Sequence, residues 1–187
     1  SENMISNNAY KPGDVIKTRN SKTIEIMNTD AEGRILLADL FEYAQDKIKD
    51  IDYIFDYATL TGSVISAIGQ YSAGIIGHNS KLKNKMIKIS RQVDEWYVDL
   101  PFNRYFFEDC YKSNIVDYVN IPTSSIGGGT ILGGGFIDNF LDKKYKNKWL
   151  HIDMTGVAFI KNRWKYHEYG ATGFRIKSGI KFIKFLI

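Results

Sequence analysis

Segments with the periodicity of strands alternate along this chain with segments that have the periodicity of helices. Residues 23–27 alternate polar and apolar side chains, as a half-buried strand does. In residues 35–48 the apolar side chains recur every three or four positions, which is typical of a helix packed on a core. Residues 51–58 and 149–154 are again strand-like, and residues 172–187 form a lysine-rich amphipathic pattern. This alternation predicts an α/β fold in which helices flank a mixed, mostly parallel sheet.

Three further segments are less regular. Residues 80–95 are rich in lysine and predict a charged surface helix, and residues 105–112 are compatible with another helix. The glycine-rich tract 127–135 has two interpretations: a helix packed closely against its neighbours, or a mobile loop. It lacks the Gly-Lys-Ser/Thr ending that a phosphate-binding loop requires.

The apolar face expected for the helix at 35–48 consists of Leu36, Leu37, Leu40, Phe41, Ala44 and Ile48.

Size and composition narrow the class of protein. The chain has 187 residues and no linker-like stretch, so residues 1–187 are expected to belong to one domain. Cys110 is the only cysteine, which excludes an intrachain disulfide, and no apolar run approaches the roughly 20 residues that a membrane span needs. The net charge of +4 is spread along the chain, which favours a solvated surface over nucleic-acid binding. We therefore expect a cytoplasmic protein without a membrane partner.

The chemically informative segment is Asn28–Arg34, at the junction between the first strand and the first long helix. In an extended backbone the side chains of Asp30, Glu32 and Arg34 would form one row, with neighbours roughly 6.5–7 Å apart. Two carboxylates that close repel each other unless a cation lies between them, so a metal site is one interpretation. A capping box from Thr29 to Glu32, with Arg34 neutralising Asp30, is the structural alternative, and spacing alone slightly favours it.

The heptapeptide resembles the signature of the leucyl aminopeptidase family (cytosol aminopeptidases, peptidase family M17), within its C-terminal catalytic domain. Other segments resemble further motifs of that family in the same order, so that the resemblance covers essentially the whole chain. These segments are residues 2–6, 9–14, 37–39, 58–62, 151–156 and 171–173. The residues that follow Ala38 and Asp39 are bulkier than is usual in the family, which predicts a repacked core.

The resemblance implies a metal-dependent enzyme that releases N-terminal, leucine-like amino acids from peptides. Asp30 would bind one of two divalent ions and Glu32 would bridge both; zinc or manganese is expected, with magnesium or cobalt as alternatives. Arg34 would hold a bicarbonate ion that serves as the general base. The family also implies a homohexamer, assembled as a dimer of trimers.

The resemblance also implies a substrate-binding segment. The backbone carbonyl of Leu60 would contact the substrate, while Thr59 and Gly62 would line the pocket for its first side chain. Thr155 and Ala158 match further positions of that pocket. Thr155 stands where the family usually has alanine, so we expect a tighter and more polar pocket.

The remaining polar residues do not complete a metal site. His151 has no second histidine or cysteine at ligand spacing, so a structural role on a buried strand is expected, and Asp56 and Asp153 are interpreted as supporting carboxylates. The family's site also uses two lysines and two aspartates from an upstream segment, which has no equivalent here. The alternative function is therefore a catalytically incomplete, oligomer-forming subunit or fragment, with the DNA-binding regulatory role that some family members have.

Overall fold

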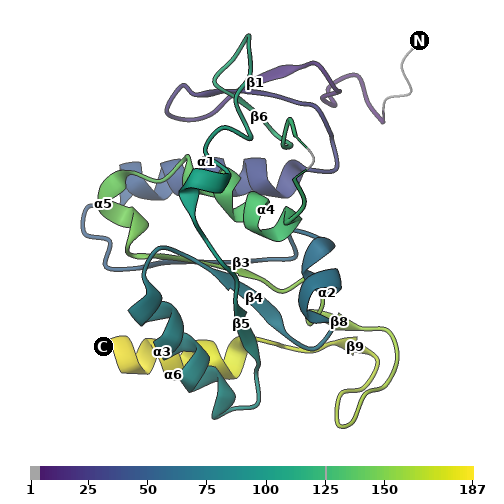
Figure 1. Cartoon of the computed structure of the whole chain (residues 1–187), viewed down its shortest axis with the longest axis vertical. Helices are drawn as coiled ribbons and strands as arrows, with labels where there is room; N and C mark the ends of the chain where they lie inside the picture. Colours follow the sequence, from purple (N-terminus) through teal and green to yellow (C-terminus); the bar gives the residue numbers. More distant parts are fainter. Residues whose placement is uncertain (1–4, 125) are drawn as a thin grey trace. The chain divides into compact units, whose positions relative to one another are not determined.

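The computed structural model describes residues 5–124 and 126–187, which divide into two compact units (Figure 1). Unit 1 comprises Ser1–Ile51, Asn103–Gly127 and Gly135–Asp142. Unit 2 comprises Asp52–Phe102, Gly128–Gly134 and Lys143–Ile187. In the described ranges no helix is both long and apolar enough to cross a membrane.

Unit 1 contains a small mixed sheet followed by a long helix. Strand β1 (Val15–Lys17) pairs antiparallel with β2 (Thr23–Glu25), and β2 pairs in parallel with β6 (Tyr118–Val119). The predicted alternation in β2 is confirmed, since Ile24 and, just beyond the strand, Ile26 are fully buried. These short strands place the residues after β2 next to those after β6.

Helix α1 (Glu32–Lys47) follows β2, as the apolar periodicity predicts. The expected buried face was largely wrong: Leu36 is 62% exposed and Leu40 is 57% exposed, so Leu40 is no part of a repacked core. Phe41 is buried as expected. The residues of α1 that are actually buried are Ile35, Ala38, Phe41 and Glu42. Which apolar stripe a helix buries depends on its neighbours, and the apolar positions of α1 wrap too far around the helix to decide this.

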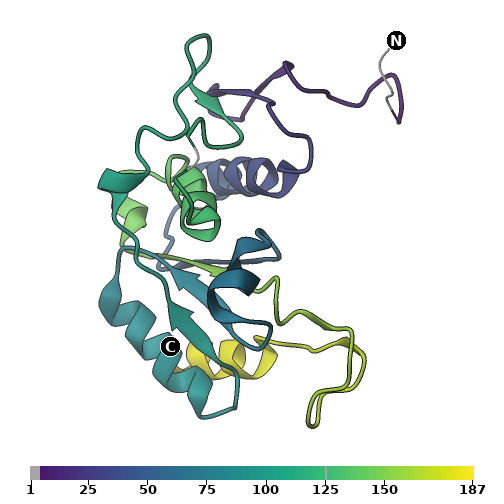
Figure 2. The same ribbon diagram turned by 45° about the vertical axis from the view of Figure 1, so that its right-hand side comes forward.

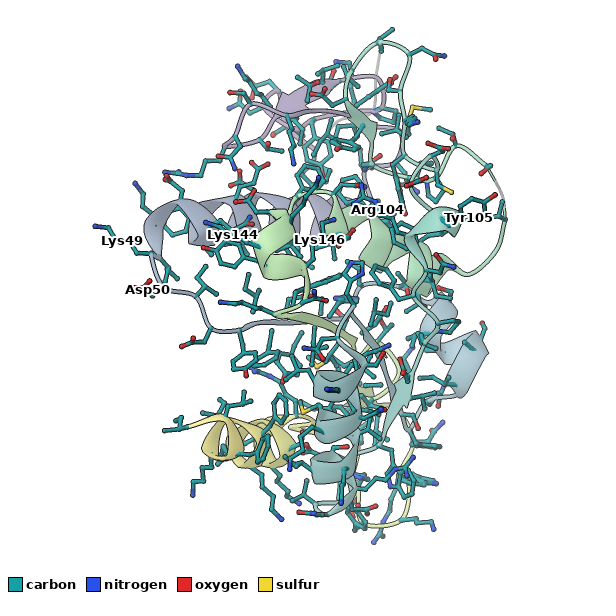
Figure 3. All side chains as sticks on the ribbon, turned by 60° about the vertical axis from the view of Figure 1, so that its left-hand side comes forward. Lys49, Asp50, Arg104, Tyr105, Lys144 and Lys146 are labelled. Carbon is teal, nitrogen blue, oxygen red and sulfur yellow. The ribbon has the colours of Figure 1, made fainter. Side chains whose placement is uncertain are left out.

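The segment 105–112 forms less helix than its pattern suggested. A short 3-10 helix, η1 (Arg104–Phe106), is followed by turns (Figure 3). The labelled Arg104 and Tyr105 side chains lie on η1, and Tyr105 is 78% exposed. Asn103 caps η1, because its side-chain oxygen accepts a hydrogen bond from the Tyr105 N–H at 3.1 Å.

Unit 2 is built on a four-stranded mixed sheet with the order β3-β7-β4-β5. Its strands are β3 (Ile54–Ala58), β7 (Trp149–Asp153), β4 (Ala73–Ile76) and β5 (Tyr97–Asp99). Strands β3 and β7 run parallel, as do β4 and β5, whereas β4 and β7 run antiparallel. The predicted mixed α/β architecture is therefore confirmed.

Helices cover this sheet as the sequence pattern suggested. Helices α3 (Ser80–Arg91) and α6 (Ile176–Leu186) lie side by side on one face (Figure 1). Their inward side chains, among them Met86 and Phe182, pack with the strand residues Ile75 and Ile152 in one core. The shorter elements are α2 (Ser63–Ile68), α5 (Lys143–Lys146), β8 (Phe159–Ile160) and β9 (Gly170–Ala171). The connection between β8 and β9 extends away from the sheet (Figure 2).

The glycine-rich tract forms the start of helix α4 (Gly129–Asp138), which confirms the interpretation of close helix packing. A Cβ atom on Gly134 would lie 3.1 Å from Ile76 in unit 2. On Gly135, in unit 1, a Cβ would lie 2.5 Å from the ring of Phe107, closer than atoms can approach. The glycines are therefore present because their neighbours leave no room for a side chain.

Candidate functional site

The segment that leads into α1 is a turn and not an extended strand. Thr29 and Asp30 lie in the turn, and the side chain of Asn28 accepts a hydrogen bond from the Asp30 N–H at 2.9 Å. The helix begins at Glu32, so Glu32 and Arg34 point in different directions. The expected single row of charged side chains is therefore wrong. The capping box is wrong as well, because the N-terminus of α1 has no side-chain capping hydrogen bond.

The structure does bring Asp30 and Glu32 together. Both side chains are exposed and line the same hollow in unit 1, next to Tyr10 and Thr29. Within the described ranges, no hydrogen bond or ion pair engages either carboxylate group. The Tyr10 hydroxyl donates to the Thr29 carbonyl at 3.3 Å, and its pKa is raised by partial burial and by the negative charge of Glu32. The hollow thus carries two carboxylates without a described partner, while Lys11, which also lines it, is ion-paired with Asp14.

Arg34 points away from these carboxylates, into the interior of unit 1. Its Nη1 donates to the Asn120 carbonyl at 3.1 Å and to the Tyr111 hydroxyl at 3.4 Å, and its guanidinium lies 6.0 Å from the centre of the Phe136 ring. The expected neutralisation of Asp30 by Arg34 is therefore not found. Burial raises the pKa of Tyr111 although the Arg34 charge opposes that shift, so the phenol stays protonated. The buried Nε of Arg34 has no hydrogen-bond partner among the described residues.

Asn120 holds the segment before Asp30, a role that no local sequence pattern indicated. Its fully buried side chain accepts hydrogen bonds from the Met27 N–H at 2.8 Å and the Asn28 N–H at 3.2 Å. Its Nδ2 donates to the Asn28 carbonyl at 2.6 Å. Asn120 follows β6, which pairs with β2, so the sheet of unit 1 delivers the amide to this position.

In unit 2 the proposed substrate-binding residues follow β3 and β7. Thr59 and Gly62 are exposed, and Leu60 is half-buried. Asp153, at the end of β7, is fully buried, and its Oδ1 accepts from the Leu60 N–H at 3.3 Å and from the Thr155 hydroxyl at 2.7 Å. One carboxylate thus ties together two segments that carry candidate substrate contacts, which agrees with a supporting role for Asp153.

A cluster of hydroxyl groups completes the environment of Asp153. Thr61 donates to its Oδ2 at 2.6 Å and lies 2.8 Å from the hydroxyl of Thr130 on α4. The Ser63 hydroxyl lies 2.9 Å from Thr130. For Thr61 these contacts are the strand-end hydrogen bonding that is the ordinary structural role of such a residue.

The last two candidate residues follow the same turn. The Thr155 hydroxyl, which the sequence predicted to make the pocket more polar, is directed to Asp153. Ala158 is half-buried, and its carbonyl accepts a hydrogen bond from the Thr172 N–H at 3.1 Å. The donor capacity of Thr155 is therefore used within the protein.

His151 is a structural histidine, as expected from its isolation in the sequence. It is fully buried on β7, and its Nδ1 lies 2.5 Å from Oδ1 of Asp56 on β3. The other oxygen of Asp56 accepts from the indole of Trp149 at 2.7 Å. Burial alone would lower the pKa of His151, but the charge and hydrogen bond of Asp56 outweigh it, so the pKa is raised.

The candidate residues therefore fall into two groups. Asp30, Glu32 and Arg34 belong to unit 1, whereas the five candidate substrate contacts belong to unit 2. Across residues 5–124 and 126–187, no group of three or more His, Cys, Asp or Glu side chains could hold a metal ion.

Comparison with known proteins identifies the family. The model of the cytosol aminopeptidase family, catalytic domain, peptidase M17, matches residues 1–179. The chain belongs to this family. It is 44% identical over 183 residues to a probable cytosol aminopeptidase of Wolinella succinogenes, a match that covers 98% of this chain and 37% of the relative. A probable cytosol aminopeptidase of Helicobacter hepaticus is also 44% identical, with 97% and 38% of the two chains covered.

Solved structures agree with this assignment. A leucyl aminopeptidase from Leishmania major in complex with actinonin matches with a TM-score of 0.87 and 31% identity, over 98% of this chain and 33% of the other. The apo leucyl aminopeptidase from Trypanosoma brucei matches with a TM-score of 0.88 and 30% identity, over 98% and 35%. The chain thus spans little more than a third of the length of the relatives it matches.

Proposed function

We propose that this chain forms part of a metal-dependent aminopeptidase that releases N-terminal, leucine-like amino acids from peptides by two-metal hydrolysis. The observation that carries the proposal is the pair Asp30 and Glu32. Both are exposed on one hollow, without a described partner, within a segment of the family's catalytic domain. Two unpaired carboxylates that line one hollow favour a bound cation, because the cation relieves their mutual repulsion.

The donors fit divalent metal ions but do not complete their coordination. Carboxylate oxygens suit zinc, manganese, magnesium or cobalt, and Asp30 and Glu32 would be among the residues that hold these ions. When bound, two such ions would polarise the scissile carbonyl and activate the attacking water. Each ion needs about four to six donors, more than two carboxylates supply. Further protein ligands must therefore join Asp30 and Glu32 in an active enzyme.

Arg34 is the proposed anchor of a bicarbonate ion. Its buried Nε lacks a partner in the described part of the chain, while Nη1 is fixed by Asn120 and Tyr111. A planar guanidinium with a free donor suits a small planar oxyanion better than a lysine does. Arg34 would hold the bicarbonate, which would supply general-base chemistry at this position.

The substrate would be held by the segments that Asp153 anchors. The Leu60 carbonyl would accept a hydrogen bond from the peptide, with Thr59 and Gly62 beside its first side chain. Thr155 and Ala158 would line the same pocket. Because the Thr155 hydroxyl is directed to Asp153, the methyl group of Thr155 remains to narrow the pocket. A narrower pocket favours smaller first residues of the substrate than an alanine at this position would.

Relatives are named cytosol aminopeptidases, and a cytoplasmic homohexamer built as a dimer of trimers is part of this proposal.

The test measures metal binding and turnover together. We expect manganese to bind this chain weakly in calorimetric titration, and the Asp30→Ala/Glu32→Ala variant to lose that binding, whereas Asp50→Ala, an exposed carboxylate elsewhere, keeps it. Equal binding by the double variant would reject the metal site. With only two donors, the chain should not measurably hydrolyse a leucine anilide at saturating zinc or manganese. Turnover that Glu32→Ala abolishes would mean that other residues of this chain complete the site.

A catalytically incomplete, oligomer-forming subunit is the second candidate function. It is favoured by the absence of any group of three or more potential metal ligands in the described ranges. Such a subunit would stay inactive even when combined with the part of a related enzyme that lies outside the matched region. The DNA-binding form of this alternative predicts a gel shift that weakens steeply with salt.

A further inference from the structure

A small cavity of unit 2 is lined in part by the connection between β8 and β9, which extends away from the sheet (Figure 2). Its volume is about 80 Å³. Its other walls come mainly from the residues that join α3 to β5 and from the segment that leads into α6. The aromatic side chains that line it are Tyr71, Trp96, Trp164, Tyr166, His167 and Phe174. We call it the aromatic cavity. None of the described residues that line it is a candidate substrate contact.

Stacked rings hold the connection that forms one wall of the aromatic cavity. The backbones of Trp164 and His167 exchange two hydrogen bonds, at 3.0 and 2.9 Å, and their rings lie nearly parallel with centres 5.8 Å apart. On the other side of the cavity wall, the ring of Tyr71 stacks on Trp164 with centres 3.8 Å apart. The aromatic wall is therefore formed in the chain itself and does not need a ligand to assemble it.

Asp94 orients two more of these aromatic side chains and adds a negative charge. Its Oδ1 accepts a hydrogen bond from the Trp96 indole at 2.8 Å, and its Oδ2 accepts one from the Tyr166 hydroxyl. These hydrogen bonds, with that of Tyr166 the stronger influence, lower the pKa of Asp94 below its usual range. Asp94 is therefore ionised at neutral pH.

Glu95 brings a second carboxylate to the aromatic cavity, and this one is buried. Its side chain is only 7% exposed, and its Oε2 accepts a hydrogen bond from the Ser178 N–H in the first turn of α6 at 2.9 Å. Among the described residues, the other oxygen, Oε1, has no hydrogen-bond partner, and the exposed Lys177 that also lines the cavity forms no ion pair. A buried carboxylate with an unpaired oxygen is costly unless a donor or a cation meets it.

We propose that the aromatic cavity binds a guanidinium group, with Oε1 of Glu95 accepting its N–H donors. A guanidinium ion carries the positive charge that Asp94 and Glu95 call for, and it donates charge-assisted hydrogen bonds. Its weakly hydrated plane also suits aromatic walls. An apolar cavity of about 150 Å³ holds a benzene molecule, so the aromatic cavity admits a smaller group of this kind. The inference uses none of the residues assigned to the proposed peptidase and stands apart from it.

Two other cations fit the aromatic cavity less well. A quaternary ammonium ion has no N–H, so it would leave Oε1 of Glu95 unpaired. A primary ammonium ion has donors, but it is more strongly hydrated than guanidinium and loses more on entering an aromatic environment. The structural alternative is that Glu95 only caps α6 at its N-terminus, where the helix dipole favours a negative charge, and that water meets Oε1.

The experiment follows the tryptophan indole signals in NMR spectra of the ¹⁵N-labelled chain during titration with methylguanidinium chloride at non-denaturing concentrations. The signals of Trp96 and Trp164 should shift saturably. The signal of Trp149, which is fully buried on β7 and does not line the cavity, should stay in place and report that the chain remains folded. Methylammonium and tetramethylammonium chloride, at the same ionic strength, should bind at least tenfold more weakly.

Substitutions separate the ligand site from the helix cap. Glu95→Gln keeps an oxygen that can accept from the Ser178 N–H but removes the charge, so it should weaken methylguanidinium binding at least tenfold. Glu108→Gln, at an exposed carboxylate of unit 1, should leave the affinity unchanged. Lys177→Met should increase the affinity, because it removes a like charge from the wall of the aromatic cavity.

The source of the guanidinium group is tested by a second titration with N-acetylarginine methylamide. Binding as tight as that of methylguanidinium would assign the aromatic cavity to an arginine side chain of a polypeptide, and binding of methylguanidinium alone would assign it to a small guanidinium compound.

Three results would overturn the inference. The first is a wild-type chain without saturable shifts, which would leave Glu95 as a helix cap. The second is equal binding of tetramethylammonium, and the third is an unchanged affinity in Glu95→Gln. If Glu95→Gln did not fold, the comparison of the three cations on the wild-type chain would decide.

Discussion

The side chain of Asn120 makes the two hydrogen bonds to Asn28 that a neighbouring strand would make. It donates to the Asn28 carbonyl at 2.6 Å and accepts from the Asn28 N–H at 3.2 Å. The backbone that leads to Asp30 is therefore held by a residue that follows a different strand. Asp153 does the same in unit 2, where its carboxylate holds the N–H of Leu60 and the hydroxyl of Thr155. In each unit a buried polar side chain fixes a loop that carries candidate site residues.

Replacing Asn120 should destabilise the chain and loosen this loop. Asn120→Ala removes three partly buried hydrogen bonds to the backbone of Met27 and Asn28, which should lower the free energy of unfolding by about 1–3 kcal/mol. Urea unfolding measures the change. Asn162→Ala, at an exposed position, should change stability by less than about 0.5 kcal/mol. Equal effects of the two substitutions would contradict the bracing role.

Bicarbonate should stabilise the chain through Arg34. The Arg34 Nε has no partner among the residues that the structure describes; if it binds the anion, rising bicarbonate concentration should raise the melting temperature of the wild-type chain above that in equimolar chloride. Arg34→Met should lose this increment, and it should also lower stability by about 1–2 kcal/mol through the lost contacts with Asn120 and Tyr111. Arg104→Met, on the exposed η1, is the matched control. The same increment in both variants would mean that the anion binds elsewhere.

The buried pair of His151 and Asp56 should make stability depend on pH. Burial opposes the charge on His151, but Asp56 outweighs it, so the folded pKa lies above the unfolded value of about 6.5. The stabilisation is complete below that unfolded pKa and is lost as the pH rises through the folded pKa. Urea unfolding should be measured at a series of pH values, from below the unfolded pKa to above the folded pKa. With increasing pH, the free energy of unfolding of the wild-type chain should fall toward that of Asp56→Asn. A difference between the two chains that stays constant with pH would contradict this coupling.

Two glycines in helices should respond to alanine in opposite ways. Gly135→Ala would place a Cβ 2.5 Å from the Phe107 ring and should destabilise the chain by about 1–3 kcal/mol. A Cβ on Gly179, in α6, would meet no other segment within 4 Å, so Gly179→Ala should stabilise by about 1 kcal/mol through helix propensity. Phe107→Leu should partly rescue Gly135→Ala if the clash is the cause. The denaturation midpoint of each variant, compared with that of the wild-type chain, shows whether the substitution stabilises or destabilises the protein.

Local patterns predicted the elements well because periodicity reflects burial directly. Strands β2 and β7 and helices α1, α3 and α6 follow from it. The buried face of α1 does not, since its apolar residues surround much of the helix and only the packing shows that Leu36 and Leu40 face solvent. The glycine tract could be read in two ways, because its helix is stabilised by neighbours that are distant in sequence.

The geometry around the candidate site residues was not predictable from the sequence. Asp30 and Glu32 do line one hollow, but through a turn, because the Asn28 side chain bonds the Asp30 N–H and ends the extended backbone. Asn120 lies 92 residues from Asn28, and Asp153 lies 93 from Leu60. Contacts at such separations follow from strand pairing in the folded chain, and no local pattern encodes them.

The glycines of α4 also bear on the order in which the chain folds. Each glycine within a helix costs roughly 1 kcal/mol relative to alanine, so Gly133, Gly134 and Gly135 leave α4 with almost no helical tendency of its own. The surfaces that stabilise the helix at Gly133 and Gly134, formed by Leu60 and Ile76, belong to other segments and must be in place first. Helix α4 should therefore be absent from early folding intermediates, and its amides should acquire protection last in pulse-labelling experiments.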